Sequence, residues 1–132
     1  KKSSYVAAII INIVLLLIFN NLLNWHVPFI TRSFLIPLRI LNISITATII
    51  ANLVFLVYDP AWFLALTRTV LNIIGLVFVY TLFIVFPFDF SSLTSEGLIV
   101  TLVKIVLIIG IFGTAVAVII EFSRFVRALA RI

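Results

Sequence analysis

The chain has 132 residues, of which 65% are hydrophobic and only 10% are charged, and its mean hydropathy is +1.44. A soluble domain carries about 25% charged residues, so this composition excludes an ordinary soluble domain and predicts a membrane protein. The net charge of +5 is not gathered into the basic face that nucleic-acid binding needs, so we expect no nucleic-acid partner. The lack of cysteine in the sequence excludes disulfides, thiolate metal sites and cysteine nucleophiles.

Four apolar runs in the sequence predict four transmembrane helices, because each is long enough to cross the roughly 30 Å hydrocarbon core of a bilayer. The second and third runs are separated by Asp59-Pro60, which predicts a tight turn and an antiparallel hairpin. The fourth run is followed by a basic segment. The expected spans are about 5–23, 34–58, 61–86 and 97–120, with a basic cytoplasmic helix at 121–131.

The basic residues predict the orientation of these spans. With both termini inside, six basic residues lie on the cytoplasmic side and three on the outer side, which agrees with the positive-inside rule. The six are Lys1, Lys2, Arg68, Arg124, Arg127 and Arg131, and the three are Arg32, Arg39 and Lys104. The prediction is therefore a single-domain, all-α integral membrane protein, an up-down-up-down bundle with both termini cytoplasmic, in a prokaryotic plasma membrane.

Three polar residues lie near the centres of their predicted spans, namely Asn12, Thr48 and Asn72. An amide or hydroxyl in hydrocarbon needs a hydrogen-bonding partner, so we expect these three to face one another inside the bundle. One interpretation is that they are interhelical hydrogen bonds that hold the bundle together. The alternative is a small polar site for a ligand or an ion.

Three basic residues also fall within the predicted spans, namely Arg39, Arg68 and Lys104. Ionisable groups inside a membrane indicate function by default, but these long side chains can also extend toward the nearer interface. By depth alone, Asp89 and Glu96 are the expected partners of Arg39 and Lys104, and Glu121 and Asp59 are those of Arg68. Anchoring or ion pairing is the favoured role, and conduction or proton relay is the alternative.

Small residues predict where helices approach closely. In the fourth span, Gly113 with Ala117 and Gly110 with Thr114 are pairs of small residues four positions apart, which favour close helix packing. In the second span, Ala47 and Ala51 recur with Ser44, Thr48 and Asn52 on one helical face, which we expect to point toward protein.

Arg124, Arg127 and Arg131 follow the fourth span on one helical face. They predict contact with lipid headgroups, either as a continuation of the fourth helix or as an amphipathic helix lying along the membrane surface. A voltage sensor is not favoured, because its arginines lie within a span and these follow one.

No catalytic residue, metal site or cofactor is predicted. His26 is the sole histidine of the sequence and stands beside Trp25, as expected of an interfacial residue, and no hydrolase or phosphate-binding motif is present. The first functional interpretation is therefore non-enzymatic: an accessory subunit, scaffold or oligomerising module that acts through contacts between helices, with the bilayer and a second copy or a partner membrane protein as its partners. The alternatives are a homo-oligomeric channel or small-solute carrier, and the membrane anchor of a longer protein.

Overall fold

The computed structural model describes residues 2–92 and 95–132, so Lys1, which the orientation prediction includes, lies outside the described residues. The regular secondary structure of the described residues is helical, and an isolated β-bridge joins Ile30 to Phe88 in the loops. The helical elements are α1 (Lys2–Asn21), the short 3-10 helix η1 (Arg32–Phe34), α2 (Leu35–Phe55), α3 (Ala61–Val85) and α4 (Glu96–Ala130). The all-α part of the predicted fold class, with four helices long and apolar enough to span a membrane, is confirmed.

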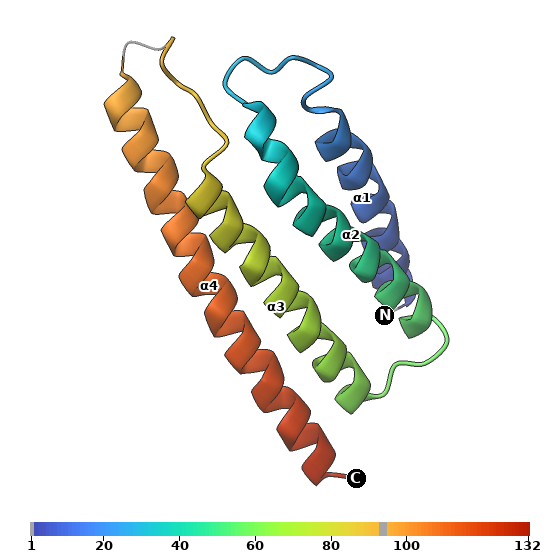
Figure 1. Cartoon of the computed structure of the whole chain (residues 1–132). Helices are drawn as coiled ribbons and strands as arrows, with labels where there is room; N and C mark the ends of the chain where they lie inside the picture. Colours follow the sequence, from blue (N-terminus) through green and yellow to red (C-terminus); the bar gives the residue numbers. More distant parts are fainter. Residues whose placement is uncertain (1, 93–94) are drawn as a thin grey trace.

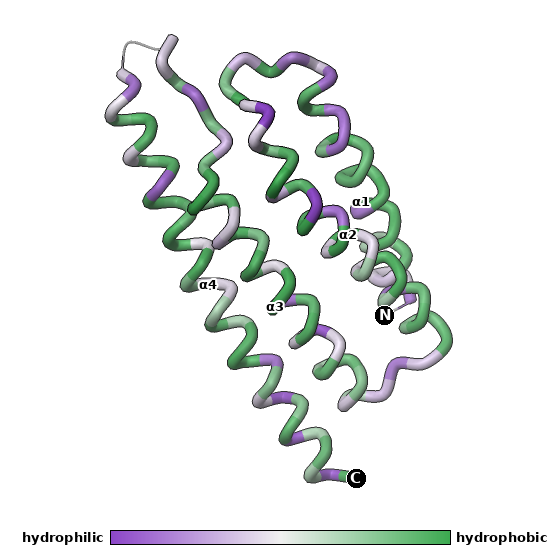
Figure 2. The backbone as a smooth tube through the Cα atoms, viewed as in Figure 1, coloured by the Kyte–Doolittle hydropathy of each residue, from purple (hydrophilic) through white to green (hydrophobic). Residues whose placement is uncertain are grey.

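All four α-helices are long and apolar enough to cross a membrane, as expected of a multi-pass membrane protein. Figure 2 shows hydrophobic residues along most of each helix, with hydrophilic ones in the loops, at the C-terminal end of α4 and at isolated positions between. The 35 residues of α4 extend for about 52 Å at the α-helical rise, well beyond one hydrocarbon thickness. The basic segment 121–131 thus continues α4 up to Ala130 instead of forming a separate helix.

The four helices stand side by side in chain order, and neighbours run in opposite directions (Figure 1). Each helix contacts the next one along the chain, but no Cα atom of α1 lies within 8 Å of a Cα atom of α4. The helices therefore form an open row and not a closed ring. Along the direction of the helix axes, the row has two ends. The start of α1, the turn between α2 and α3 and the end of α4 lie at one end, and the loop between α1 and α2 lies at the other (Figure 1).

The two loops at the opposite end of the row are joined by backbone hydrogen bonds. The Thr31 N–H donates to the Pro87 carbonyl at 2.9 Å, and the Asp89 N–H donates to the Phe29 carbonyl at 2.8 Å. Phe29 also stacks on Phe90, with ring centroids 5.7 Å apart. These contacts tie the α1–α2 hairpin to the α3–α4 hairpin at this end.

The loop between α3 and α4 holds Asp89, a carboxylate whose pKa is shifted. Asp89 Oδ1 accepts a hydrogen bond from the Ser91 N–H at 3.0 Å. Hydrogen bonds from the hydroxyl and the N–H of Ser91 favour the ionised form, so the pKa of Asp89 lies below its ordinary value of 3.8.

The core lies toward the other end of the row, among α1, α2 and α3. Tyr5, Phe55 and Leu64 are buried there, and the Tyr5 and Phe55 rings are 5.4 Å apart. The Tyr5 hydroxyl donates a 2.8 Å hydrogen bond to Asp59 in the turn before α3. The start of α1 is thereby fastened to the α2–α3 turn.

Candidate functional site

A polar groove runs along one side of the row, with a volume of about 690 Å³, and it is lined by residues from all four helices. Because α1 and α4 both border it without contacting each other, the row curves around the groove. Its polar lining residues are Ser4, Tyr5, Ser44, Thr48, Asn52, Arg68, Asn72, Thr114 and Glu121. The groove therefore gathers polar side chains that are otherwise sparse on these apolar helices.

Several polar groups in the groove are satisfied within their own helices. The Thr48 hydroxyl donates to the Ser44 carbonyl at 2.8 Å, and the Asn52 amide donates to the Thr48 carbonyl at 2.8 Å. The Thr114 hydroxyl likewise donates to the Gly110 carbonyl at 2.6 Å. These donors need no partner across the groove, although the oxygens of the same groups can still accept hydrogen bonds.

Asn72 and Arg68, unlike these residues, make no side-chain hydrogen bond within their own helix. Among the described residues, neither side chain has a hydrogen-bonding or ionic partner, and both line the groove on α3. Asn72 lies close to the middle of Ala61–Val85, at the depth where hydrocarbon surrounds a spanning helix. An unpaired amide in hydrocarbon is costly, so Asn72 is a residue of the groove that needs a hydrogen-bonding partner.

The structure brings together two of the three residues predicted to form a polar layer. Thr48 and Asn72 both line the groove, whereas Asn12 does not, and its amide donates at 2.7 Å to the Ala8 carbonyl of its own helix. A different amide pair joins α1 to α2 near the loop end. Asn20 and Asn42 exchange two hydrogen bonds of 2.7 and 2.9 Å, which the sequence analysis did not identify.

The basic residues within the spans are not ion-paired in the described part of the chain. Arg39 is exposed in the second turn of α2. The Lys104 ammonium lies 5.3 Å from the centre of the Phe86 ring, just beyond the end of α3. Lys104 thus reaches toward the loop end of the row, as a long basic side chain near an interface does.

The small residues of α4 lie on two different faces. An added Cβ at Gly110 would stand 3.4 Å from a Val79 methyl group, and one at Gly75 would stand 4.0 Å from a Thr114 methyl group. Gly110 and Thr114 therefore lie where α4 meets α3. Gly113 is exposed and an added Cβ there meets nothing within 4 Å, while Ala117 is half-buried.

On α2, Ala51 lies in the buried core beside Tyr5 and Phe55, and Ala47 is half-buried. Ala51 thus contributes to packing at the end of the row near the chain termini.

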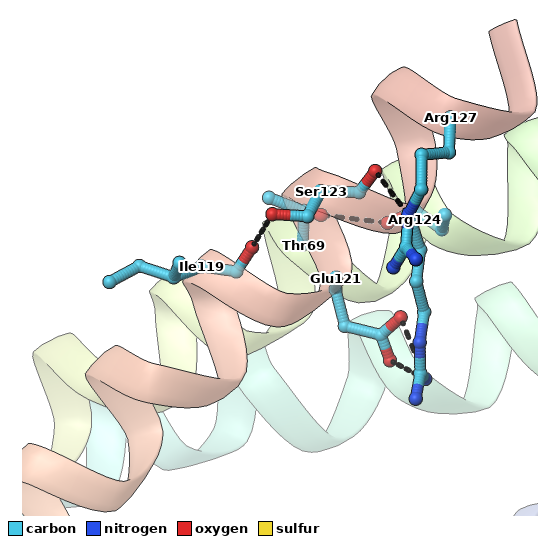
Figure 3. A network of polar contacts seen from close by, with 7 residues as sticks. Thr69, Ile119, Glu121, Ser123, Arg124 and Arg127 are labelled. Carbon is cyan, nitrogen blue, oxygen red and sulfur yellow. Dashed lines mark hydrogen bonds and ion pairs between the residues drawn. The ribbon is translucent and has the colours of Figure 1, made fainter. Parts of the chain in front are cut away.

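The arginines at the C-terminal end of α4 border a second cavity, of about 640 Å³, between the start of α3 and the end of α4. Figure 3 shows Glu121, Arg124 and Arg127 on this part of α4. Arg124 Nη1 lies 3.4 Å from Glu121 Oε1, and Arg127 Nε donates at 3.4 Å to the Ser123 carbonyl. Arg68 and Glu121 line both cavities, so the groove and this second cavity adjoin.

Comparisons with protein-family models, curated proteins and solved structures find no match to this chain. What the chain does is therefore inferred from its own residues.

Proposed function

We propose that this protein is a non-enzymatic multi-pass membrane subunit that assembles through its polar groove. The open row supports this proposal. Four helices that closed on themselves would shield their polar faces from lipid, whereas here the polar lining stays open to whatever borders the row. In a bilayer, helices associate through such polar contacts and close packing, because lipid is as apolar as the helices themselves.

The occupant that best fits the groove is a second copy of the chain. The Asn72 amide both donates and accepts hydrogen bonds, so it can pair with an identical amide. The same groove carries a cation, Arg68, and an anion, Glu121, so a two-fold axis can set the cation of one copy near the anion of the other. A second copy supplies all these complementary groups by symmetry.

A polar-solute site is the second candidate function, and the size of the groove favours it. Its volume of about 690 Å³ is within the range of about 300–1,000 Å³ of ligand pockets. Two copies with facing grooves would also enclose a polar space, as in the alternative of a homo-oligomeric channel or small-solute carrier. Binding or flux of a solute that disappears in Asn72→Leu, while assembly persists, would favour this second function over the first.

The arrangement of the helices is compatible with the predicted orientation. Both termini and the α2–α3 turn lie at one end of the row, together with the arginines of α4 (Figure 1). We propose that this end is cytoplasmic, in line with the positive-inside rule. A labelling experiment from each side of the membrane tests this directly, and a terminus accessible only from outside would contradict it.

Cysteine crosslinking in native membranes tests the proposed assembly, because the sequence contains no cysteine that would interfere. Asn72→Cys puts a single thiol in the groove, and Ile73→Cys puts one at nearly the same depth on a residue that is 45% exposed and outside the groove. A short bis-maleimide should yield covalent dimers of Asn72→Cys in clear excess over Ile73→Cys. Equal yields, or adducts of Asn72→Cys with other proteins alone, would contradict self-assembly through the groove.

A further inference from the structure

The cavity between α3 and α4 forms an arginine pocket, which we define by Arg68 of α3, Arg124 and Arg127 of α4, and Arg131 directly after α4. Glu121 is the acidic residue among its lining residues, so the formal charge of the lining side chains is +3. The four guanidinium groups come from two helices, and not only from the basic segment of α4 that the sequence indicates. A cavity with this excess of positive charge attracts an anion.

The guanidinium groups are only partly engaged within the chain. Arg124 is 58% exposed and contacts Glu121 at 3.4 Å, a long distance for a charge-assisted hydrogen bond. Arg127 uses its Nε on the Ser123 carbonyl, which leaves its two terminal nitrogens for another acceptor (Figure 3). In the described chain, Arg68 and Arg131 have no hydrogen-bonding or ionic partner. Most of the donors of the pocket thus remain for a ligand.

The rest of the lining favours a ligand with a charged group next to an apolar part. Trp62 and Leu64 of α3 and Ile132 after α4 form apolar walls beside the arginines. The pocket also includes Ala61, where α3 begins with no side chain capping its first N–H groups. The positive end of the helix dipole therefore adds to the potential of the arginines.

We propose that the arginine pocket binds a phosphate group, carried either by an anionic lipid headgroup or by a soluble phosphate compound. Guanidinium groups match phosphate oxygens in pairs, and several arginines that line one cavity distinguish such a site from a single interfacial anchor. The pocket lies at the end of the row where α4 extends beyond one hydrocarbon thickness, which is the level of headgroups and of the adjoining water. The pocket shares Arg68 and Glu121 with the groove, but Arg124, Arg127 and Arg131 line the pocket alone, so phosphate binding does not depend on self-assembly.

Trp62 provides a reporter inside the pocket. The sequence has two tryptophans, and the other, Trp25, is exposed in the loop at the opposite end of the row. In a Trp25→Phe background, Trp62 fluorescence is recorded for the full chain in phosphatidylcholine nanodiscs. The first probe is phosphatidylglycerol with brominated acyl chains, compared with brominated phosphatidylcholine. The second probe is inorganic pyrophosphate added to the buffer.

The expected result is a saturable change in Trp62 fluorescence with one of the probes. Brominated phosphatidylglycerol quenching beyond that of brominated phosphatidylcholine assigns the phosphate to a lipid, and a response to pyrophosphate alone assigns it to a soluble compound. Replacing Arg124, Arg127 and Arg131 together by glutamine should weaken the response on the order of 100-fold, given what each arginine contributes near a charged surface.

Two variants separate a specific site from general surface charge. The single change Arg127→Gln removes one exposed side chain and should weaken the response about fivefold without disturbing the fold. Arg32→Gln removes an equal charge at the loop end, outside the pocket, and should leave the response unchanged. The proposal is overturned if neither probe produces a response, if the triple variant responds like the wild type, or if Arg32→Gln and Arg127→Gln weaken the response equally.

Discussion

Replacing Asn72 by leucine should weaken self-association of the protein in a bilayer, whereas replacing Asn12 by leucine should not. Both asparagines lie near the middle of a spanning helix, but their surroundings differ. Asn72 lines the groove without a partner among the described residues, and Asn12 lies outside the groove and bonds to the Ala8 carbonyl at 2.7 Å. The two substitutions therefore change hydropathy alike, but only Asn72→Leu removes a polar group from the groove.

The size of the effect follows from the number of asparagines in a dimer. A two-fold assembly contains Asn72 twice, and a polar contact between membrane helices contributes about 0.6 kcal/mol on average and about 1.7 kcal/mol at most. Losing both contacts therefore costs about 1.2–3.4 kcal/mol, which raises the dissociation constant of the dimer about 8-fold to about 300-fold. For Asn12→Leu we expect no measurable change.

Energy transfer between labelled copies, measured in liposomes over a series of protein-to-lipid ratios, gives the dissociation constant for each variant. Circular dichroism of each variant confirms that the helices remain formed. The reasoning is refuted if Asn72→Leu associates as tightly as the wild type, or if Asn12→Leu weakens association by the same factor. A wild type that stays monomeric at every ratio would refute self-assembly itself.

Three further predictions concern contacts within the chain. Gly110→Leu should destabilise the protein by about 1–3 kcal/mol in thermal unfolding, because a side chain there enters the α3–α4 contact. Gly113→Leu should be nearly neutral, since an added Cβ there meets nothing within 4 Å. The same loss of stability in both variants would contradict this packing. Tyr5→Phe should cost about 1 kcal/mol by removing the 2.8 Å hydrogen bond to the exposed Asp59, and unchanged amide exchange at the start of α1 would contradict it. The lowered pKa of Asp89 means that its stabilisation of the loop is complete above the ordinary value of 3.8 and is lost as the pH falls through the lower folded value. Acid should therefore lower the protection of this loop's amides, measured as exchange relative to the intrinsic rate at each pH, in the wild type and not in Asp89→Asn.

The positions of the helices could be predicted from the sequence because each apolar run ends at residues that interrupt it. The third run is expected at 61–86, and α3 extends from Ala61 to Val85, between Pro60 and Pro87. Phe86 adopts a left-handed backbone conformation, with φ of 45°, and this ends the helix one residue earlier than hydropathy alone indicates. Hydropathy carries no information on such a backbone change, since phenylalanine is as apolar as the residues before it.

The faces of the helices were harder to predict, because lipid and the protein interior are both apolar. A helix in water buries its apolar face, but a spanning helix is apolar all round, so only its few polar residues report which side faces protein. The sequence predicts Thr48, Asn72 and Asn12 as interior residues, and of these Thr48 and Asn72 line the groove. It treats Asn12 as equivalent, because the depth of a polar residue in its span does not tell which neighbouring helix its face meets, and Asn12 lies outside the groove.

The open row follows from contacts that only the three-dimensional structure reveals. The Asn20–Asn42 amide pair joins α1 to α2, and the hydrogen bonds from Thr31 to Pro87 and from Asp89 to Phe29 join the loops of the two hairpins. Both ties act between neighbours in the row, and no close contact draws α1 to α4.

Small residues in α4 indicate that a helix approaches, but not which face of α4 it meets. Gly110 lies against α3, whereas Gly113, three positions on, is exposed. Because a helix advances about 100° per residue, a shift of three positions is enough to move a small residue from the α3 contact to the surface that borders lipid.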